Sequence, residues 1–426
     1  MRRFARIFFK TLAITLCIAA LAFYALAVYP LRNPHPPLQL PTTTLAIRDA
    51  RVYLSPDEPP HDHANILIRN GRIAAVGHTI NIPADAQLIP CNACTVTAGF
   101  WNVHVHFTER KWSNAAYQPA AILNAQLADM LTSRGFTTVA DLGSNLADTV
   151  SLRRRIETGT LLGPHIYTAG AAQYPPHGIP FYLRDTLPWF ILRLMPQPDT
   201  PAQAARDEQR NFASGADLLK LFTGSYIEHG IVKPMPLANA SAAASVAHQH
   251  GQLVFAHPSD LEGVTIARDA GVDVLAHAAD TTDGVTAALL QTIVDHHMAM
   301  VPTLKMFRTT VTTNPRYLDP IYAEVRQFHA LHGELLFGTD VGYMTDYTTQ
   351  DEFQALTQSG LTPQDILRML TTAPAARFGV QAEKGTIAPG KLADLVVLGS
   401  DPAQNPLAFS DVRTTIRTGR VLYTRP

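Results

Sequence analysis

Between about residue 98 and residue 379, short apolar runs alternate with longer stretches of helical character. In chain order the runs are FWNVHVHF, FTTVADL, HIYTAG, DLLKLF, QLVFAH, DVLAHA, AMVPTL and LLFGTD. A helical stretch, such as residues 120–133 or residues 201–215, lies between each run and the next. Alternating strands and helices predict a parallel sheet. Eight strands in this pattern predict a (β/α)8 TIM barrel, an α/β fold whose functional side chains lie at the C-terminal ends of the strands.

The two ends of the chain show a different pattern, in which short β-type runs are separated by turn residues. These runs are residues 43–56, 64–77, 86–99, 392–402 and 412–424. The Asn70-Gly71 pair is a hairpin signal, because both residues accept the positive φ of a tight turn. We therefore expect a small composite β-sandwich domain, made of residues 44–97 and 380–426, beside a barrel domain of residues 98–379.

Residues 1–30 combine positive charge with an uninterrupted apolar segment. Four basic residues come first, and they are Arg2, Arg3, Arg6 and Lys10. The uncharged segment that follows, residues 11–29, has about 19 residues, long enough to cross a bilayer as a helix. Basic residues before such a segment predict a cytoplasmic N-terminus and an exported body. We favour a membrane anchor, and a signal peptide cleaved after Ala25-Leu26-Ala27 is the alternative. The Pro-rich linker, residues 31–43, is expected to hold the body away from the bilayer.

Composition narrows the possible functions. Hydrophobic residues make up 46% of the 426 residues and charged residues 16%, which excludes a disordered chain. The 34 Lys and Arg residues nearly balance the 35 Asp and Glu residues without forming a basic stripe, so no nucleic-acid partner is expected. Cys91 and Cys94 form a single C-x-x-C pair, which cannot supply a four-ligand zinc site. In an oxidising compartment they can form a disulfide, and two free thiols are the alternative.

Polar side chains gather at the predicted C-terminal ends of the barrel strands. His104 and His106 are two residues apart in the first strand, so both point to the same face. Later strands contribute Lys220, His257, His277 and Asp340. Each alone could be structural, as a satisfied core histidine, half of an ion pair or a helix cap. Their common position favours a metal centre, because neutral imidazole is the commonest protein ligand for metals.

These motifs, in this order, resemble those of the amidohydrolase superfamily, in the group related to imidazolonepropionases and Xaa-Pro dipeptidases. GFWNVHVHF resembles the first-strand HxH motif of the family, and GADLLKLF resembles its lysine strand. LVFAHP and DVLAHA resemble its two later histidine strands, and LLFGTD resembles its final aspartate strand. The segment from LTTAPAARFGV to KLADLVVL resembles the part in which the chain returns to the β-domain. The resemblance extends from about residue 44 to the end, and it implies a metal-dependent hydrolase that cleaves C–N bonds.

The resemblance also implies the roles of the site residues. The implied metal ligands are His104, His106, Lys220, His257, His277 and Asp340. The first two histidines would bind a more buried ion and the last two a more exposed one. Lys220, carbamylated by carbon dioxide, would bridge the ions, although a site with one ion is the alternative. Zn²⁺ suits these ligands, with Mn²⁺, Co²⁺ and Fe²⁺ as other candidates. Asp340 would also move the proton from the attacking hydroxide to the leaving nitrogen.

Two features bear on activity and substrate. The family usually has an acidic residue two positions before the first histidine, where this chain has Asn102, which can hydrogen-bond but carries no charge. Residues 169–185, rich in aromatics and proline, are expected to form a pocket wall or lid. Tyr226, close to Lys220, is the favoured contact for a small-molecule or short-peptide substrate. The remaining polar candidates are Arg184, His229, Lys233 and Arg308.

Two alternatives to C–N bond hydrolysis remain at this point. The same metal pair can attack a polarised ester, so an esterase, lactonase or phosphotriesterase also fits the motifs. A membrane-tethered binding protein with an inactive site is the other alternative, and Asn102 is its only support.

Overall fold

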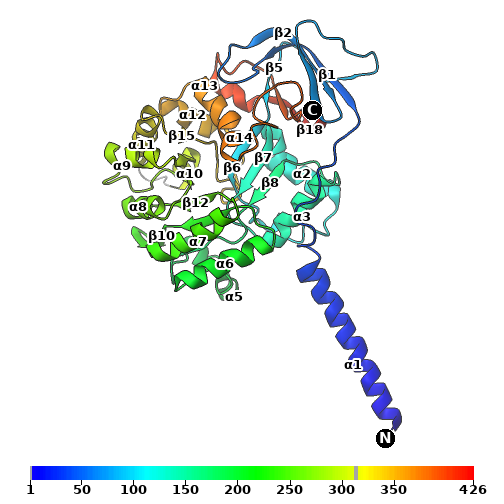
Figure 1. Cartoon of the computed structure of the whole chain (residues 1–426), viewed down its shortest axis with the longest axis vertical. Coiled ribbons are helices and arrows are strands. Elements are labelled where there is room, and N and C mark those ends of the chain that lie inside the picture. The colour runs from blue at the N-terminus through cyan, green and yellow to red at the C-terminus, as the bar shows by residue number, and fades with distance from the viewer. Residues whose placement is uncertain (1, 311–314) are drawn as a thin grey trace.

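The computed structural model describes residues 2–310 and 315–426, and Figure 1 shows a two-part body from which one long helix projects. The larger part is built on parallel strands. These are β6 (Phe100–Val105), β7 (Phe136–Asp141), β8 (His165–Thr168), β9 (Leu219–Phe222), β12 (Val254–His257), β13 (Val274–Leu275), β14 (Ala299–Met300) and β15 (Glu334–Leu335). They form one sheet in the order β6-β7-β8 and a second in the order β15-β14-β13-β12-β9. All eight predicted barrel strands are thus present.

Backbone hydrogen bonds join these two sheets at both edges. Between β8 and β9, the N–H of Asp217 donates to the carbonyl of Thr168 at 2.7 Å. Between β6 and the segment after β15, the N–H of Asp340 donates to the carbonyl of His104 at 2.9 Å. The strands therefore follow one another in chain order around a ring. This arrangement is the TIM-barrel-type α/β fold that the alternating pattern predicts.

Helices cover the outside of this ring. The local sequence explains where they begin: the side chain of Thr200 caps α6 by accepting the N–H of Gln203, and Pro201 occupies the first turn. The longer helices are α2 (Ala120–Met130), α3 (Leu146–Glu157), α6 (Pro201–Ala213), α7 (Leu237–Gln249), α8 (Leu261–Asp269), α9 (Ala287–Asp295), α10 (Leu304–Thr310), α11 (Leu318–Ala330), α12 (Gln350–Gln358), α13 (Pro363–Leu370) and α14 (Thr372–Arg377). The helical stretches predicted between the strands are confirmed.

Shorter elements lie in the loops and were not predicted. They are η2 (Arg110–Trp112), η3 (Thr132–Arg134), α4 (Phe181–Arg184), α5 (Trp189–Leu192), the hairpin β10 (Gly224–Glu228) and β11 (Ile231–Pro234), η4 (Pro315–Tyr317) and η5 (Pro406–Ser410). The hairpin follows β9 directly. Gly224, at its start, lies so close to the segment after β12 that an added Cβ would be 2.3 Å from the carbonyl oxygen of Pro258.

The second part of the body is one sheet built from both ends of the chain. Its strands are β1 (Thr44–Val52), β2 (His61–Arg69), β3 (Arg72–Gly77), β4 (Gln87–Leu88), β5 (Thr95–Ala98), β16 (Leu395–Leu398), β17 (Val412–Arg417) and β18 (Arg420–Thr424). Their order is β18-β17-β16-β5-β1-β2-β3, with β4 paired to β1. Asn70 and Gly71 have φ angles of 49° and 75° and connect β2 to β3, which confirms the hairpin. The two packed layers of a sandwich and the domain limits stay predictions.

The interior of the ring below the candidate site is apolar. Trp101 and Val103 of β6 pack there with Phe255 and Val301 from other strands. A register irregularity interrupts the pairing of β6 with β7 between Asn102 and Val105. The strict alternation of side chains between the two faces of the strand is broken at this irregularity. Trp101 and Val103 can therefore point into the apolar interior while His104 and His106, further along the strand, point into the candidate site.

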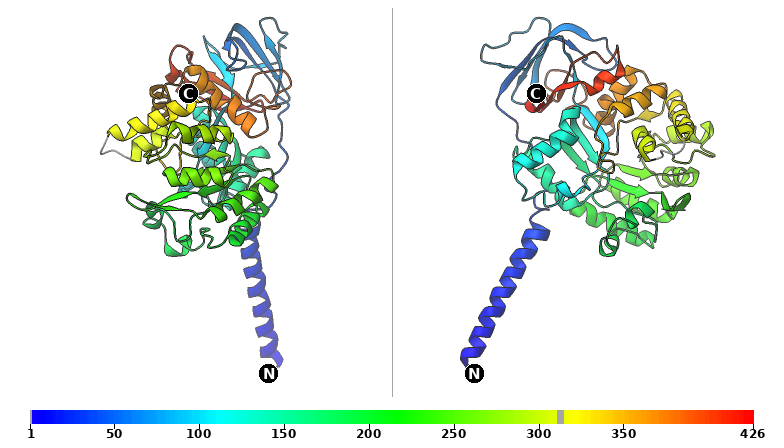
Figure 2. Two further views of the ribbon diagram at one scale, coloured as in Figure 1. Left: turned by 60° about the vertical axis from the view of Figure 1, so that its left-hand side comes forward. Right: turned by 180° about the vertical axis from the view of Figure 1, so that it is seen from behind.

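The apolar N-terminal segment forms the projecting helix. α1 spans Arg2–Phe23 and continues as a π-helical turn, Tyr24–Val28. Residues Phe8–Val28 are long and apolar enough to cross a membrane, and none of this segment is buried in the body. Figure 2 shows the helix leaving the end of the body opposite the β1–β3 sheet in both further views.

The linker contacts α3 of the barrel, while its expected role in holding the body away from the bilayer stays a prediction. Arg153 of α3 donates from Nε to the carbonyl of Pro34 at 2.8 Å. Arg154 donates to the carbonyls of Tyr29 at 3.0 Å and of Arg32 at 2.9 Å. These contacts hold the linker against the surface of the barrel.

Candidate metal centre

The predicted site residues meet at the C-terminal end of the ring. Nε2 of His104 lies 3.3 Å from Oδ1 of Asp340, and Nε2 of His106 lies 3.0 Å from the same oxygen. The ring centroid of His277 lies 4.5 Å from that of His104 and 4.4 Å from that of His257. The four imidazoles thus form a continuous cluster beside one carboxylate.

Lys220 is the sixth member of this group. Its side chain is only 1% exposed, and its Nζ lies 5.5 Å from the ring centroid of Phe222. That ring stacks on His257 with centroids 4.8 Å apart. Burial lowers the pKa of Lys220 to about 7, and the Asp340 carboxylate opposes this shift only in part. A neutral amine is therefore available on Lys220 at neutral pH.

Hydrogen bonds on the Nδ1 side orient three of the imidazoles. Nδ1 of His104 lies 2.8 Å from the carbonyl oxygen of Ala276, and Nδ1 of His106 lies 2.8 Å from that of Gly143. A carbonyl can only accept, so both Nδ1 atoms carry a hydrogen, and in the neutral ring, the form that binds a metal, each Nε2 keeps a lone pair. Partners of this kind are what fix the tautomer and direction of metal-binding histidines.

The third imidazole, His277, is oriented through a hydroxyl. Nδ1 of His277 lies 2.7 Å from Oγ1 of Thr303. The Thr303 hydroxyl donates its own hydrogen to the carbonyl of Pro302 at 2.8 Å. Oγ1 therefore accepts from Nδ1 of His277, which leaves the Nε2 lone pair of this histidine free for a ligand as well.

The donor atoms fit a divalent cation. One ligand atom each from His104, His277 and Asp340 can be chosen so that all lie within 4.8 Å of one another. Nε2 of His104 and Oδ1 of Asp340 are buried and have no hydrogen-bond partner in the structure. Leaving such atoms unpaired costs about 1–3 kcal/mol each. A cation between them would satisfy both, because each presents a lone pair.

Burial also keeps most of these imidazoles neutral, which is the form that binds metals. Burial lowers the pKa of His104, His257 and His277 well below the ordinary histidine value, and neighbouring positive groups lower it further. His106 differs: burial lowers its pKa, but Asp340, Asp141 and the Gly143 carbonyl together outweigh this effect and raise it.

The backbone holds Asp340 in an uncommon conformation. Its φ angle is 59°, in the left-handed region that few residues other than Gly, Asn and Asp adopt. The neighbouring Gly342 approaches β6 so closely that an added Cβ would lie 1.8 Å from the carbonyl oxygen of His106. This close approach, together with the bond from the Asp340 N–H to the carbonyl of His104, brings the carboxylate over the first strand.

Comparison with known proteins agrees with this geometry. A family model described as the amidohydrolase family matches residues 95–422. The chain belongs to the amidohydrolase family. The predicted class of enzyme, a hydrolase acting on carbon–nitrogen bonds, is confirmed by this membership. A comparison of this amidohydrolase with curated protein sequences gives no match.

Solved structures share the fold of this amidohydrolase at low sequence identity. A Xaa-Pro dipeptidase with bound methionine has 21% identity and a TM-score of 0.74, covering 90% of this chain and 100% of its own. Ochratoxinase from A. niger has 19% identity and a TM-score of 0.71, covering 90% and 96%. Molinate hydrolase has 18% identity and a TM-score of 0.74, covering 89% and 94%.

Asn102 of this amidohydrolase connects the first and last strands of the ring. Its Nδ2 donates to Oγ1 of Thr339 at 2.7 Å. Its Oδ1 accepts from the N–H of His104 at 3.2 Å and from the N–H of Thr339 at 3.3 Å. The side chain is fully buried. These bonds support the backbone of both His104 and the residue before Asp340, and they need no charge on residue 102.

The sequence reasoning missed two acids near this site, and the first is Asp280. Its Oδ2 lies 3.7 Å from Nε2 of His257 and has no hydrogen-bond partner. Burial raises the pKa of Asp280 to about 7. The signal was present in DVLAHAAD, where a carboxylate follows His277 by three residues beyond a strand end. A second missed acid, Asp141, is buried at the end of β7, 4.0 Å from Nδ1 of His106.

The substrate candidates are distributed unevenly. The hydroxyl of Tyr226 lies 3.1 Å from Oγ1 of Thr281, next to Asp280, so Tyr226 is near the cluster. His229 packs against Phe181, with ring centroids 4.3 Å apart. Arg308 forms an ion pair with Asp351 on α12 instead.

The remaining two candidates lie on the loop elements. Arg184, in α4, donates to the carbonyl of Ile227 at 2.9 Å. Lys233 lies on β11, opposite Ser225. Within the described parts of the chain, neither residue forms a hydrogen bond or an ion pair with the histidine cluster.

The predicted lid, residues 169–185, contacts the surroundings of the cluster through aromatic rings. Tyr174 stacks on Phe222 with centroids 4.6 Å apart, and Phe222 in turn stacks on His257. The ring centroids of Tyr182 and Tyr343 lie 5.5 Å apart, and Tyr343 follows Asp340 by three residues. An aromatic path therefore connects this loop to both sides of the candidate site.

Proposed function

We propose that this amidohydrolase is a metal-dependent enzyme that cleaves an amide or peptide-like C–N bond in a small molecule or short peptide. The proposal rests on the direction in which three imidazole rings point. In the neutral rings, hydrogen bonds at Nδ1 leave the Nε2 atoms of His104, His106 and His277 for a ligand. Two of these atoms face Oδ1 of Asp340, a buried atom without a hydrogen-bond partner.

Six residues would hold two divalent ions, preferably Zn²⁺. They are His104, His106, Lys220, His257, His277 and Asp340. A positive charge on Lys220 lowers the pKa of both His104 and His257, so the side chain is close to a histidine of each pair. This position suits a residue that would serve both ions. Its neutral amine could add to carbon dioxide and lose a proton, giving a carbamate whose oxygens are ligands.

The chain's own residues would carry out the proton transfers. Bound divalent ions would supply Lewis acidity and lower the pKa of water from 15.7 to about 7. Asp340 would take the proton of the attacking water and deliver it to the leaving nitrogen. Tyr226, on the β10–β11 hairpin, would contact the substrate beside Thr281. The loop over residues 169–185 would limit the access of bulk water.

The fit of Asn102 weakens the support for an inactive binding protein. Its hydrogen bonds connect His104 to Thr339 without a charged group, so the absence of an acid at this position does not disturb the cluster. Ester, lactone and phosphotriester hydrolysis remain alternatives for the same centre. The test is metal analysis of the purified chain, together with rates on acylated amino acids, dipeptides, aryl esters and lactones. Two ions per chain and the fastest turnover on an amide are expected; a chain without metal, or one that cleaves only esters, would overturn the proposal.

We further propose that residues 8–28 anchor the enzyme, with its catalytic body outside the cytoplasm. The uncovered apolar helix supports this, and so does the disulfide between Cys91 and Cys94, whose Cα atoms are 5.1 Å apart. A reporter active only outside the cytoplasm, fused after Pro426, tests the compartment. Fractionation and N-terminal sequencing separate an anchor from a signal peptide: a soluble mature chain that begins near Val28 would refute the anchor.

A further inference from the structure

An exposed apolar patch lies at the tip of the loop between β8 and α6. It consists of Trp189, Phe190 and Ile191 of α5 together with Leu194, and we call it the α5 patch. The exposed fractions are 69% for Trp189, 52% for Phe190 and 78% for Leu194. Single exposed apolar residues are common, but a contiguous group of this size on a soluble surface indicates a binding surface.

The position of the α5 patch relative to the apolar helix is fixed by the docked linker. Beside the contacts from Arg153 and Arg154, Oγ of Ser151 lies 3.1 Å from the carbonyl oxygen of Pro30. Gly215 lies so near Pro34 that an added Cβ would approach its ring to 2.5 Å. The helix therefore leaves from a defined point on the barrel rather than from a flexible tether.

All three views place α5 at the end of the body from which α1 leaves (Figures 1 and 2). A membrane surface crossed by α1 near its exit point would therefore face the same end of the body as the α5 patch. The sheet made by both chain ends lies at the opposite end (Figure 1).

Two stacked tyrosines lie at the point where the apolar helix leaves the body. Tyr29 and Tyr117 stack with ring centroids 5.8 Å apart, and the guanidinium of Arg154 lies 4.9 Å from the Tyr29 ring. Tyr117 is 51% exposed although it lies in the body. Tyrosine and tryptophan are enriched where membrane proteins cross the boundary between lipid and water.

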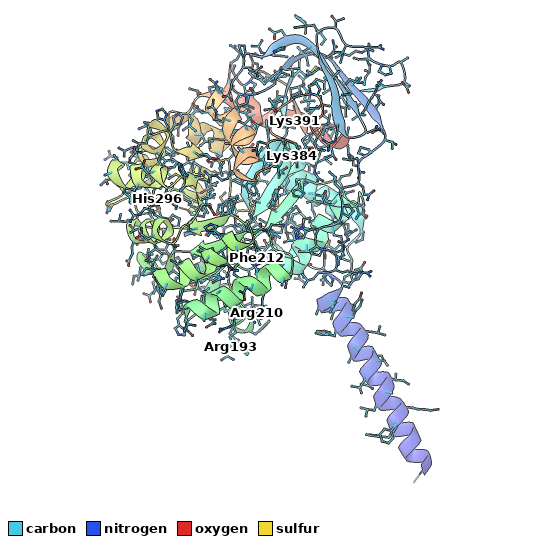
Figure 3. All side chains as sticks on the ribbon, viewed as in Figure 1. Arg193, Arg210, Phe212, His296, Lys384 and Lys391 are labelled. Carbon is cyan, nitrogen blue, oxygen red and sulfur yellow. A yellow bond between two sulfur atoms is a disulfide. The ribbon has the colours of Figure 1, made fainter. Side chains whose placement is uncertain are left out.

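The α5 patch has the same chemistry. The guanidinium of Arg193 lies 5.3 Å from the ring centroid of Trp189. Figure 3 shows Arg193 at the outer edge of the body, beside α5. Apolar and aromatic side chains with an adjacent arginine suit a bilayer interface, where the rings enter the lipid and the guanidinium meets phosphate groups.

We propose that the α5 patch is a second membrane contact, which enters the headgroup region of the leaflet on the side where the body lies. This inference rests on the proposed anchor, since the helix brings the patch to the bilayer. Apolar side chains of interfacial helices reach about 5–10 Å into the boundary between headgroups and acyl chains. Two contacts, the helix and the patch, would prevent the body from rotating about the anchor.

The second contact would also fix the loop that borders the candidate site. α5 belongs to the same loop as Tyr174 and Tyr182, and Tyr174 connects to His257 through Phe222. Contact with lipid at one end of this loop therefore holds its other end, near the histidine cluster, at a constant orientation to the membrane.

The natural tryptophans allow a direct test with the full chain. The protein has three tryptophans, and Trp101 and Trp112 are buried, so Trp189 is the exposed one. The chain would be reconstituted into phosphatidylcholine vesicles whose acyl chains carry bromine either near the headgroup or near the chain end. We expect shallow bromine to quench most of the Trp189 emission, deep bromine to quench less, and aqueous acrylamide to quench little.

Three variants complete the experiment. Trp189→Phe should remove the bromine-sensitive emission. Phe190→Asp combined with Leu194→Asp should transfer Trp189 to the acrylamide-sensitive population. Leu407→Asp, at an exposed leucine of η5, which packs against α12, is the matched control and should change nothing.

The outcomes separate the two proposals. If acrylamide quenches Trp189 of the membrane-bound chain and bromine does not, the second contact is overturned and the anchor is unaffected. Chain that is recovered from cells in the soluble fraction, with the apolar segment removed, would refute the anchor, and the inference would fall with it. Quenching by shallow bromine that the double variant abolishes would support the second contact.

Discussion

Nε2 of His104 lies 3.3 Å from Oδ1 of Asp340, and neither atom has a hydrogen-bond partner. The two residues come from opposite ends of the barrel sequence, one in β6 and the other after β15. They meet only because the segment after the last strand bonds to the first strand, through the N–H of Asp340 and the carbonyl of His104. Closure of the ring and assembly of the candidate centre are therefore the same structural event.

Replacement of Asp340 by Asn tests its proposed role in proton transfer. Asn keeps the shape and tolerates the φ of 59°, so the fold should persist. It lacks the basic oxygen, and we expect kcat to fall by about 10²–10⁴, the range for acid–base groups. Asp319→Asn, at an exposed position on α11, is the control. A kcat within about twofold of the unaltered enzyme, with metal retained, would contradict the assignment.

Lys220→Ala tests the bridge between the two proposed ions. Loss of the amine removes the site of carbamate formation, so the variant should retain at most a small part of its metal and activity. Added short carboxylates with excess metal should restore part of the activity, since they can occupy the space of the lost side chain. Lys391→Ala, which removes a lysine that bonds to backbone carbonyls far from the cluster, should behave like the unaltered enzyme. Full metal content in Lys220→Ala would rule out the bridging role.

Asn102 should tolerate an acid but not a truncation. Asn102→Asp can still accept from the N–H groups of His104 and Thr339, and its other oxygen can accept from the Thr339 hydroxyl. Asn102→Ala leaves these buried donors without a partner, at about 1–3 kcal/mol for each. We expect the Asp variant to keep its metal and rate, and the Ala variant to unfold at lower urea concentration and bind metal more weakly. Equal behaviour of the two variants would show that the hydrogen bonds are not needed.

Asp280→Asn tests the acid that faces His257. Groups that contact metal-binding histidines typically change metal affinity or activity by about 10–100-fold when replaced. We expect a loss of that size in kcat/KM, together with weaker retention of the more exposed ion, measured by metal analysis after dialysis against a chelator. The control is Asp283→Asn, an exposed acid three residues along the chain. If Asp280→Asn changes KM alone, Asp280 contacts substrate rather than His257.

Local sequence patterns were sufficient to predict the ring of strands and the cluster. Apolar runs identify the strands, and the geometry of a parallel barrel then brings their C-terminal ends together, although His104 and Asp340 are far apart in the chain. The docking of the linker could not be predicted in this way. The contact between Arg153 and the carbonyl of Pro34 joins a side chain to backbone more than a hundred residues away, and no local pattern encodes it.

Asp280 and the hairpin after Lys220 were missed for related reasons. Asp280 follows a strand of only two residues, Val274–Leu275, so its distance from the strand end hid its position in the site. The hairpin depends on the close approach of Gly224 to the carbonyl of Pro258, a tertiary contact. The state of Cys91 and Cys94, which the sequence left open, is resolved by the structure as a disulfide.

The buried ion pair between Glu157 and Arg417 should make the joint between the two parts of the body sensitive to acid. Glu157 ends α3 of the barrel, Arg417 ends β17 of the sheet, and Nη2 of Arg417 lies 2.6 Å and 2.8 Å from the two carboxylate oxygens. Burial alone would raise the pKa of Glu157, but Arg417 and His165 outweigh it and hold the pKa below its usual value. A depressed carboxylate pKa contributes stability above the unfolded value, about 4.3, and loses it as pH falls towards the folded value.

We therefore expect Glu157→Gln to destabilise the protein at about pH 7 by about 3–5 kcal/mol, because it leaves the Arg417 guanidinium buried without its counter-charge. Urea unfolding of the full chain in detergent, followed at about pH 7 and about pH 3.5, measures this. The difference between Glu157→Gln and the unaltered chain should shrink at the lower pH, because the unfolded chain binds a proton at Glu157 there while the folded chain does not, and this lowers the stability of the unaltered chain. Glu228→Gln, at an exposed position in β10, should show no such difference. A Glu157→Gln variant as stable as the unaltered chain at about pH 7 would show that the sheet and the barrel are held together without this pair.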